Sequence, residues 1–298
     1  MQGDKPDRVD TTGSNDAPAT DQRRRRYDLN ALTYSNSFDN PMKRALIRGI
    51  EWMTGKITII RMIRQFEQVN PIEPSAFWAE ALKVMGIRIG TPDAQVAHIP
   101  STGPVVFVAN HPHGMVDGMV LGALINRVRD DYKILTRSLL TDIDPIASRY
   151  LIPVPFPHQS DAQEKMVEMR TRAMEELNAG GLIVVFPSGG VATSRTAFGP
   201  VIESDWNVFT AKIIRTTGAT VVPCYFPGEN SRAYQIANQV SATLRQSLLL
   251  REIVRSRNTR ISPVIGPPLD PAFVTEQLKE PRRFMAWLRD HTLALKDG

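Results

Sequence analysis

The spacing of hydrophobic residues changes near residue 100 of the 298-residue chain. Before that point, apolar side chains recur every three or four residues, at Met42, Leu46, Ile50, Met53, Ile57 and Ile60. This is the period of an α-helix, so it predicts an amphipathic helical segment over 42–64, which Gly55 can divide in two, and a shorter helix follows over 74–85. Residues 1–30 are polar and lack this period, which predicts a disordered tail.

Beyond residue 100, short apolar runs alternate with helical stretches. The predicted strands are 104–109, 132–136, 151–155, 182–186, 220–225 and 260–265. The predicted helices are 118–127, 162–178, 206–216, 233–255 and 271–295. Strands that are apolar throughout are typical of a sheet that is buried on both faces. The alternation therefore predicts an α/β fold, with a twisted, mostly parallel sheet and helices on both of its faces.

The net charge of +5 is concentrated in the amphipathic segment. Residues 42–64 carry six basic side chains against the single acidic Glu51, whereas the charges of residues 1–30 cancel. A basic amphipathic helix that contains a tryptophan, here Trp52, is typical of helices at an anionic membrane surface. In the alternative interpretation, the apolar stripe packs on the core and the basic face is solvated. Nucleic acid is a poor partner, because no aromatic residues are interleaved with the charges.

The sequence predicts a protein that lies on a membrane and does not cross it. No apolar run approaches the roughly 18 to 20 residues that span a bilayer, and the polar start of the chain is unlike a signal peptide. We therefore expect a cytoplasmic protein, peripheral on the inner face of the membrane. Its expected parts are a disordered tail (1–30), a helical membrane-interface segment (31–90) and an α/β domain (91–298).

Two histidines and an aspartate follow the first strand of the predicted sheet, in the run Asn110-His111-Pro112-His113-Gly114-Met115-Val116-Asp117. Open α/β sheets place their sites at the carboxyl ends of strands. An imidazole paired with a carboxylate is a common general base, because the carboxylate fixes the tautomer and stabilises the imidazolium. From the first turn of the next helix, Asp117 can reach either histidine. The alternative is a helix-capping aspartate beside two turn histidines.

Other chemistries fit this run less well. A His-x-His-x-Asp-His zinc motif is broken by Met115 and Val116, and no later Cys/His cluster completes a bare His-x-His metal site. The single cysteine, Cys224, lies in an apolar strand and excludes an internal disulfide and a cysteine-based zinc site. The sequences Gly-x-Ser-x-Gly, Walker A and Gly-x-Gly-x-x-Gly do not occur.

A second strand ends in a glycine-rich loop, Phe186-Pro187-Ser188-Gly189-Gly190. Consecutive glycines allow backbone N–H groups to approach an anion or oxyanion, and Ser188 and Arg195 add further donors. An ordinary turn is the alternative. A third block, Val221-Val222-Pro223, is a strand that contains a proline.

In this order, the three blocks resemble the lysophospholipid/glycerolipid acyltransferase superfamily, which includes the 1-acylglycerol-3-phosphate acyltransferases. The usual pattern of that superfamily is Asn-His-x4-Asp, Phe-Pro-Glu-Gly-Thr-Arg-Ser and Val-Pro-Val. The resemblance covers residues 98–226, and the stretch over 227–269 is similar to the bacterial hemolysin-related, ornithine-lipid-type branch.

The resemblance implies transfer of a fatty acyl chain from acyl-CoA or acyl-carrier protein to a hydroxyl of a lysolipid, in phospholipid or aminolipid biosynthesis, without a metal or other cofactor. It implies that His111 is the catalytic base and that Asp117 orients it, with His113 as the alternative base. The implied substrate-binding residues are Asn110, Arg137, Pro187, Ser188, Gly189, Gly190 and Arg195. A non-catalytic lipid-binding or membrane-scaffold protein on the same fold is the alternative.

The sequence departs from the superfamily pattern at two places. His111 is one residue farther from Asp117 than the pattern requires, and His113 is one residue closer. Ser188 stands where the superfamily has glutamate, and no arginine follows Gly190 directly. Because that Glu/Arg pair helps to hold glycerol phosphate in the superfamily, we expect an acceptor other than glycerol 3-phosphate or lysophosphatidate. Arg137 is the candidate substitute for the missing acceptor-binding arginine.

Overall fold

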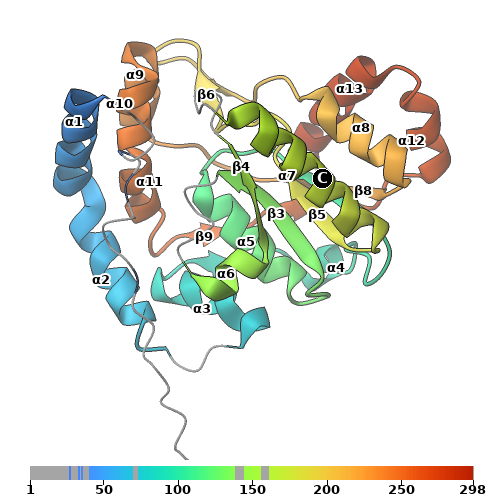
Figure 1. Ribbon diagram of the computed structural model, residues 1–298, viewed down its shortest axis with the longest axis horizontal. Coiled ribbons are helices and arrows are strands. Elements are labelled where there is room, and N and C mark those ends of the chain that lie inside the picture. The colour runs from blue at the N-terminus through green and yellow to red at the C-terminus, as the bar shows by residue number, and fades with distance from the viewer. Residues whose placement is uncertain are drawn as a thin grey trace, which may run out of the picture.

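A six-stranded sheet forms the centre of the protein (Figure 1). The computed structural model describes residues 27, 33, 35, 40–69, 73–137, 144–155 and 161–297. The strand order is β10 (Val264–Ile265), β8 (Thr220–Tyr225), β2 (Val105–Ala109), β5 (Leu182–Val185), β3 (Tyr132–Arg137) and β4 (Leu151–Val154). All neighbours are parallel except β10, which is antiparallel to β8. The predicted α/β class with a mostly parallel sheet is therefore confirmed.

Strand β2 lies in the middle of the sheet and is buried along its whole length. Its alternate side chains point to opposite faces, so that Phe107 joins one hydrophobic core and Val106 joins the other. In register, Val105 pairs with Leu182 of β5 on one side and with Thr220 of β8 on the other. The carboxyl ends of these three strands therefore meet at one edge of the sheet, where the loops that follow β2 and β5 lie together.

Helices cover both faces of the sheet, as the apolar strands predicted. One core contains side chains of α2 (Ile57–Phe66), α3 (Phe77–Val84), α5 (Met115–Ile125) and α11 (Leu249–Arg255). The other contains side chains of α7 (Ala162–Asn178), α8 (Val208–Thr217), α12 (Pro271–Gln277) and α13 (Pro281–Ala294). Along the chain, the short helix α4 (Asp93–Val96) precedes β2, and the short helix α6 (Pro145–Arg149) connects β3 to β4.

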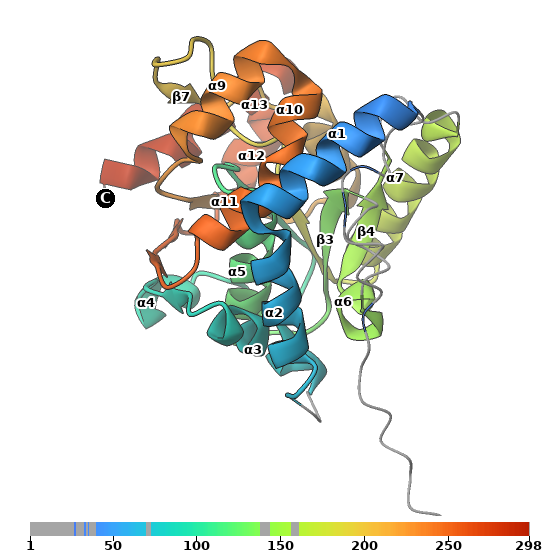
Figure 2. The ribbon, with the colours of Figure 1, turned by 90° about the vertical axis from the view of Figure 1, so that its left-hand side faces the viewer.

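The N-terminal helices turn their predicted apolar stripe outward. Helix α1 (Pro41–Glu51) continues through a π-helical turn, η2 (Trp52–Lys56), into α2, with non-helical backbone angles at Gly55 where a division was predicted. In Figure 2, α1 lies against α10 (Ala242–Ser247), and η2 contacts α11. The buried apolar residues of these helices are Ile47, Ile59, Met62 and Phe66. The exposed ones are Met42, Leu46, Trp52, Met53 and Ile57. The alternative of a core-packing helix with a solvated basic face therefore holds for α2, but most of the predicted stripe does not pack on the core.

Several boundaries differ from the prediction. Ser241 separates α9 (Arg232–Val240) from α10, and Leu248 separates α10 from α11, so 233–255 forms three helices and not one. Pro281 starts a new helix within 271–295. Pro263 separates β9 (Arg260–Ile261), which pairs with β1 (Arg88–Ile89), from β10. A hairpin of β6 (Thr193–Ser194) and β7 (Val201–Ile202) was not predicted.

The predicted parts of the chain are only partly visible in the fold. The predicted tail over 1–30 lies outside the described residues, apart from Tyr27. Side chains of α2 and α3 belong to the same core as the sheet, so these helices are continuous in packing with the α/β body. Among the described residues, no helix combines the length and the apolar character needed to span a bilayer.

Candidate active site

Asp117 occupies the first turn of α5, directly after the loop that leaves β2. Gly114 caps this helix with a φ of 79°, a left-handed conformation that favours glycine. The turn brings the Asp117 carboxylate back over the loop, where Oδ2 accepts hydrogen bonds from the backbone N–H groups of Gly114 (3.1 Å) and His113 (2.9 Å). The Asp117 side chain is fully buried. The aspartate thus caps the helix, as one interpretation predicted, and remains close to both histidines.

Both histidines bind this one carboxylate. The distance from His111 Nδ1 to Asp117 Oδ2 is 3.0 Å, and that from His113 Nδ1 to Asp117 Oδ1 is 2.8 Å. Burial works to raise the pKa of Asp117, but the two imidazoles outweigh it and the pKa is lowered. Burial likewise works to lower the pKa of His113, and the carboxylate outweighs that effect, so the pKa of His113 is raised. Asp117 is therefore held as an anion between two imidazoles.

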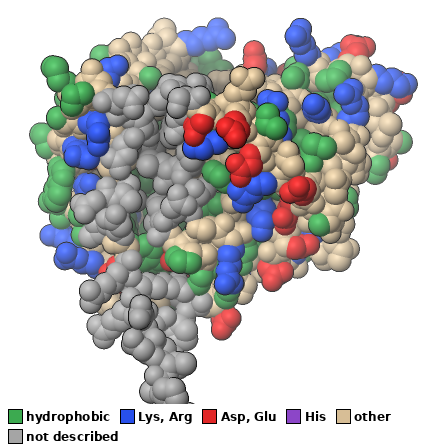
Figure 3. All heavy atoms as spheres, viewed as in Figure 1, with side chains coloured by type: hydrophobic (Ala, Val, Ile, Leu, Met, Phe, Trp, Pro, Cys, Tyr) green, Lys and Arg blue, Asp and Glu red, His purple; other side chains and the backbone are tan. Residues whose placement is uncertain are grey.

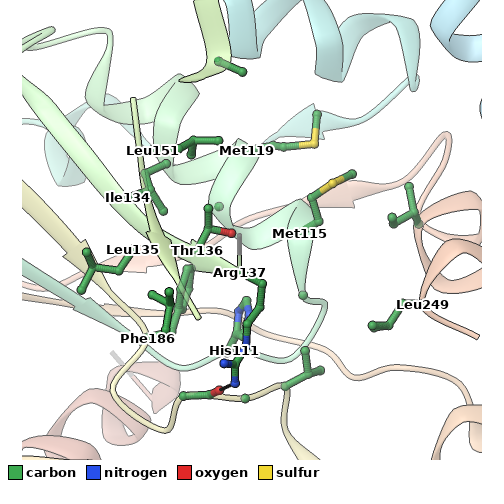
Figure 4. A pocket seen from close by; sticks show the side chains of 18 of the residues that line it. His111, Met115, Met119, Ile134, Leu135, Thr136, Arg137, Leu151, Phe186 and Leu249 are labelled. Carbon is green, nitrogen blue, oxygen red and sulfur yellow. Dashed lines mark hydrogen bonds between the residues drawn. The ribbon is translucent and has the colours of Figure 1, made fainter. Parts of the chain in front are cut away.

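The two imidazoles differ in what their other nitrogen faces. The ring of His113 is directed at Gly228, where an added Cβ would lie 2.7 Å from Nε2. The ring of His111 lines a large pocket and stacks on Phe186, with a centroid distance of 4.0 Å and an interplanar angle of 26° (Figure 4). Since Asp117 binds Nδ1 of His111, the Nε2 atom is left for the pocket. The geometry thus favours His111 over His113 as the base.

The pocket has a volume of about 660 Å³ and extends from His111 over the first hydrophobic core. Its wall is mostly apolar, with side chains from α2, α3 and α5 that include Ile59, Met62, Phe66, Phe77, Trp78 and Met119. Figure 4 shows His111 and Arg137 at the same end, with Met115 and Met119 farther along. An apolar cavity with a few polar groups at one end suits a ligand that has a hydrocarbon chain and a polar reacting group.

Arg137 joins the glycine-rich loop to the end of β4. Its Nη2 donates to the carbonyl of Gly189 at 2.9 Å, and its Nη1 donates to the carbonyl of Pro155 at 3.0 Å. Burial lowers the pKa of the Arg137 guanidinium. The arginine that the sequence suggested as a substitute for a missing one therefore lies beside the candidate base, and it also fixes the loop.

For the residues that the structure describes, the glycine-rich loop places one unbonded backbone N–H donor, that of Gly190, among the residues that line the pocket. The N–H of Gly189 donates to the carbonyl of Phe186 at 2.9 Å, so it is already used in a turn. Within the described part of the chain, the N–H of Gly190 makes no hydrogen bond, and Gly190 lines the pocket together with Pro187 and Gly189. Of the two predicted oxyanion donors, Gly189 and Gly190, only Gly190 therefore has an N–H group that is not already bonded within the described residues.

Three other predicted site residues do not line the pocket. The Asn110 amide exchanges two hydrogen bonds with the backbone of Phe226, at 2.9 and 2.6 Å, and so ties the end of β2 to the end of β8. The Ser188 hydroxyl donates to the carbonyl of Gly190, within its own loop. Arg195 is exposed beside the β6–β7 hairpin. As predicted, Cys224 is buried, and burial raises its pKa well above the usual range.

The sequence analysis missed Glu203. This residue follows β7 and is buried, and its carboxylate accepts a hydrogen bond from the backbone N–H of His111 at 3.2 Å. It lies 92 positions from His111 along the chain, within Pro200-Val201-Ile202-Glu203-Ser204. No periodic pattern or motif marks that stretch of sequence. The β6–β7 hairpin, which brings Glu203 to His111, was not predicted either.

The chain is similar to several known proteins. The model of a family described as "Acyltransferase" matches residues 46–254, which include His111, Asp117 and Glu203. A lyso-glycine lipid O-acyltransferase of Phocaeicola vulgatus is 27% identical over 201 residues, which cover 65% of this chain and 68% of the relative. An enzyme of the same name from Bacteroides thetaiotaomicron is 27% identical over 208 residues, 65% of this chain and 71% of the relative.

A solved structure is also similar. It is the crystal structure of the 1-acyl-sn-glycerophosphate (LPA) acyltransferase PlsC from Thermotoga maritima. The TM-score is 0.44 at 13% sequence identity, and the match covers 85% of this chain and 95% of that one.

We predict that replacing His111 with alanine lowers turnover by roughly a hundredfold or more, the scale of a lost general base. His113→Ala should cost less, because its ring faces Gly228 and not the pocket. Steady-state rates of both variants, with circular dichroism to confirm folding, test the assignment. Full activity in His111→Ala together with an inactive His113→Ala would contradict it.

Proposed function

The chain belongs to the acyltransferase family, and on that premise we propose that its pocket catalyses transfer of a fatty acyl chain to a hydroxyl group of a lysolipid. The observation that carries this proposal is the His111–Asp117 pair at the polar end of a long apolar pocket. The names of the two relatives, lyso-glycine lipid O-acyltransferases, support a lysolipid acceptor. The proposed donor is acyl-CoA or acyl-carrier protein.

The site geometry supports direct transfer between the two substrates. Asp117 accepts a hydrogen bond from the Nδ1–H group of His111, so Nε2 is the basic nitrogen. Nε2 removes the proton of the acceptor hydroxyl while the hydroxyl oxygen attacks the thioester carbon. The N–H of Gly190 is the proposed donor to the resulting oxyanion. When the oxyanion collapses, the C–S bond breaks and the leaving thiolate takes the proton from the His111 imidazolium.

The wall of the pocket suggests where each substrate part is held. The acyl chain fits along the apolar side chains of α2, α3 and α5. Arg137 lies at the polar end, where it can attract an anionic part of the acceptor or donor. Ser188, in place of the superfamily glutamate, turns its hydroxyl to Gly190. We therefore propose an aminolipid acceptor that carries a free hydroxyl, in preference to lysophosphatidate or glycerol 3-phosphate.

Product analysis tests this assignment. Purified protein would be incubated with labelled acyl-CoA or acyl-carrier protein and with a lyso-glycine lipid, lysophosphatidate or glycerol 3-phosphate. We expect an O-acylated aminolipid, at a rate that Asp117→Asn lowers strongly because the His111 tautomer is no longer fixed. A clear preference for lysophosphatidate would contradict the proposed acceptor. Lipid binding without any product would favour the alternative of a non-catalytic lipid-binding protein.

The proposed place of this reaction is an anionic membrane surface, on the cytoplasmic side. The most exposed apolar side chains of the N-terminal helices are Met53 (87%) and Met42 (80%), and each lies within one turn of a basic residue. Figure 3 shows hydrophobic and basic side chains mixed along the left-hand edge, where α1 and α2 lie in Figure 1. Exposed apolar groups between cations favour a surface that has both a hydrocarbon interior and anionic headgroups.

Salt-dependent binding to vesicles tests the membrane proposal. Each basic residue near an anionic surface contributes about 1 kcal/mol, so reversing exposed Lys43, Arg61 and Arg64 to glutamate should abolish most of the binding. The matched control reverses exposed Lys212, Arg215 and Arg282, which lie on α8 and α13 at the opposite side of the molecule. Equal sedimentation of both triple variants with anionic liposomes would mean that the N-terminal helices have no special role.

We also predict that activity needs no bound transition metal. In the described ranges, no three His, Cys, Asp or Glu side chains are grouped so that they could hold a metal ion. The proposed proton transfers use only His111 and Asp117. Metal analysis of the purified protein, with activity measured before and after chelation, tests this. Stoichiometric zinc or iron that is lost together with activity would overturn the mechanism.

A further inference from the structure

Glu203 forms a second carboxylate contact to the candidate base. The side chain is 6% exposed, and each of its oxygens accepts a hydrogen bond from an N–H group. Oε2 accepts from the backbone N–H of His111 and Oε1 from the indole N–H of Trp206, both at 3.2 Å. A carboxyl group that accepts N–H donors at both oxygens is best satisfied in its ionised form.

Residues 187–207, the segment that carries Glu203, form hydrogen bonds with both peptide groups of His111. The carbonyl of His111 accepts a hydrogen bond from the N–H of Ala192 at 2.8 Å, so both of its peptide groups are bound by residues of this segment. The N–H of Asn207 donates to the carbonyl of Pro187 at 2.9 Å and closes the segment on itself. The backbone of His111 is thus fixed by a loop that comes from a different part of the sequence than Asp117.

We propose that Glu203 is a positioning residue for His111, an inference that rests on the proposed function. It holds the His111 main chain in place, and it adds a negative charge near the imidazole. Asp117 binds Nδ1 of the His111 ring, and Glu203 binds the backbone N–H of the same residue. The charge of Glu203 stabilises the imidazolium that forms when His111 takes the proton of the acceptor hydroxyl.

Other charged groups near His111 also act on its imidazole, and Glu203→Gln leaves them in place. Asp117 and His113 lie on the side of α5, and Arg137 approaches from β3. Burial raises the pKa of Glu203, while the hydrogen bonds from the His111 N–H and the Trp206 indole limit the rise.

The test compares Glu203→Gln with Asp205→Asn. Both remove one negative charge, but Asp205 is exposed and pairs with Arg289 on the surface. Titration of the His111 imidazole, followed by NMR of ¹⁵N-histidine protein, does not depend on activity. In Glu203→Gln we expect its midpoint to move to lower pH, because a negative charge near the imidazole is lost. The acid limb of the kcat/KM profile should move equally, with about a tenfold lower plateau from the weaker base. Asp205→Asn should leave both unchanged.

The outcomes separate the possible failures. A Glu203→Gln protein with the wild-type His111 midpoint overturns the inference, even if its rate falls, because the residue would then be a structural anchor only. Wild-type protein without acyltransferase activity overturns the proposed function, while the NMR shift still decides the role of Glu203. If Glu203→Gln does not fold, Glu203→Asp decides. Its shorter chain cannot reach both N–H donors, so a wild-type rate and midpoint in that variant would also overturn the inference.

Discussion

The site depends on one buried carboxylate that serves two imidazoles and the start of a helix. Asp117 accepts hydrogen bonds from two backbone N–H groups at the amino end of α5, where the helix dipole favours an anion. The same carboxylate binds His111 and His113 through their Nδ1 atoms. Because every one of these donors favours the ionised form, the charge survives complete burial. This constraint fixes the tautomer of His111 and directs its Nε2 atom to the pocket.

The order of the strands places this local arrangement at the mouth of an apolar pocket. Parallel pairing of β2 with β5 and β8 brings three separate loops to one edge of the sheet. The apolar pocket begins there and runs under α2, whose buried face supplies Ile59 and Met62 to its wall. The segments that precede α2, namely α1 and η2, expose Met42 and Met53 at the surface. The helix that lines the pocket is thus continuous along the chain with the surface that we propose to contact the membrane.

Much of the fold and the His111–Asp117 pair could be predicted, because local sequence patterns determine both. Apolar runs marked the strands, and the position of Asp117 one turn into a helix was enough to bring it within reach of both histidines. The extra residue between His111 and Asp117 is accommodated by the left-handed turn at Gly114, which spacing alone does not show. The division of 233–255 depends on the cap that Ser241 provides. Glu203 was missed for a deeper reason: its contact with His111 exists only after the β6–β7 hairpin has formed, and no local pattern encodes so distant a contact.

The central claim is that Nε2 of His111, and not of His113, is the basic nitrogen in the pocket. Reaction with diethyl pyrocarbonate, which modifies unprotonated imidazole nitrogens, tests it directly when each modified histidine is located by tandem mass spectrometry. Our account predicts that modification of His111 parallels the loss of acyl transfer, that a bound lysolipid slows it, and that His113 stays unmodified in the folded protein. Loss of activity that follows modification of His113, or full activity with His111 modified, would contradict the account.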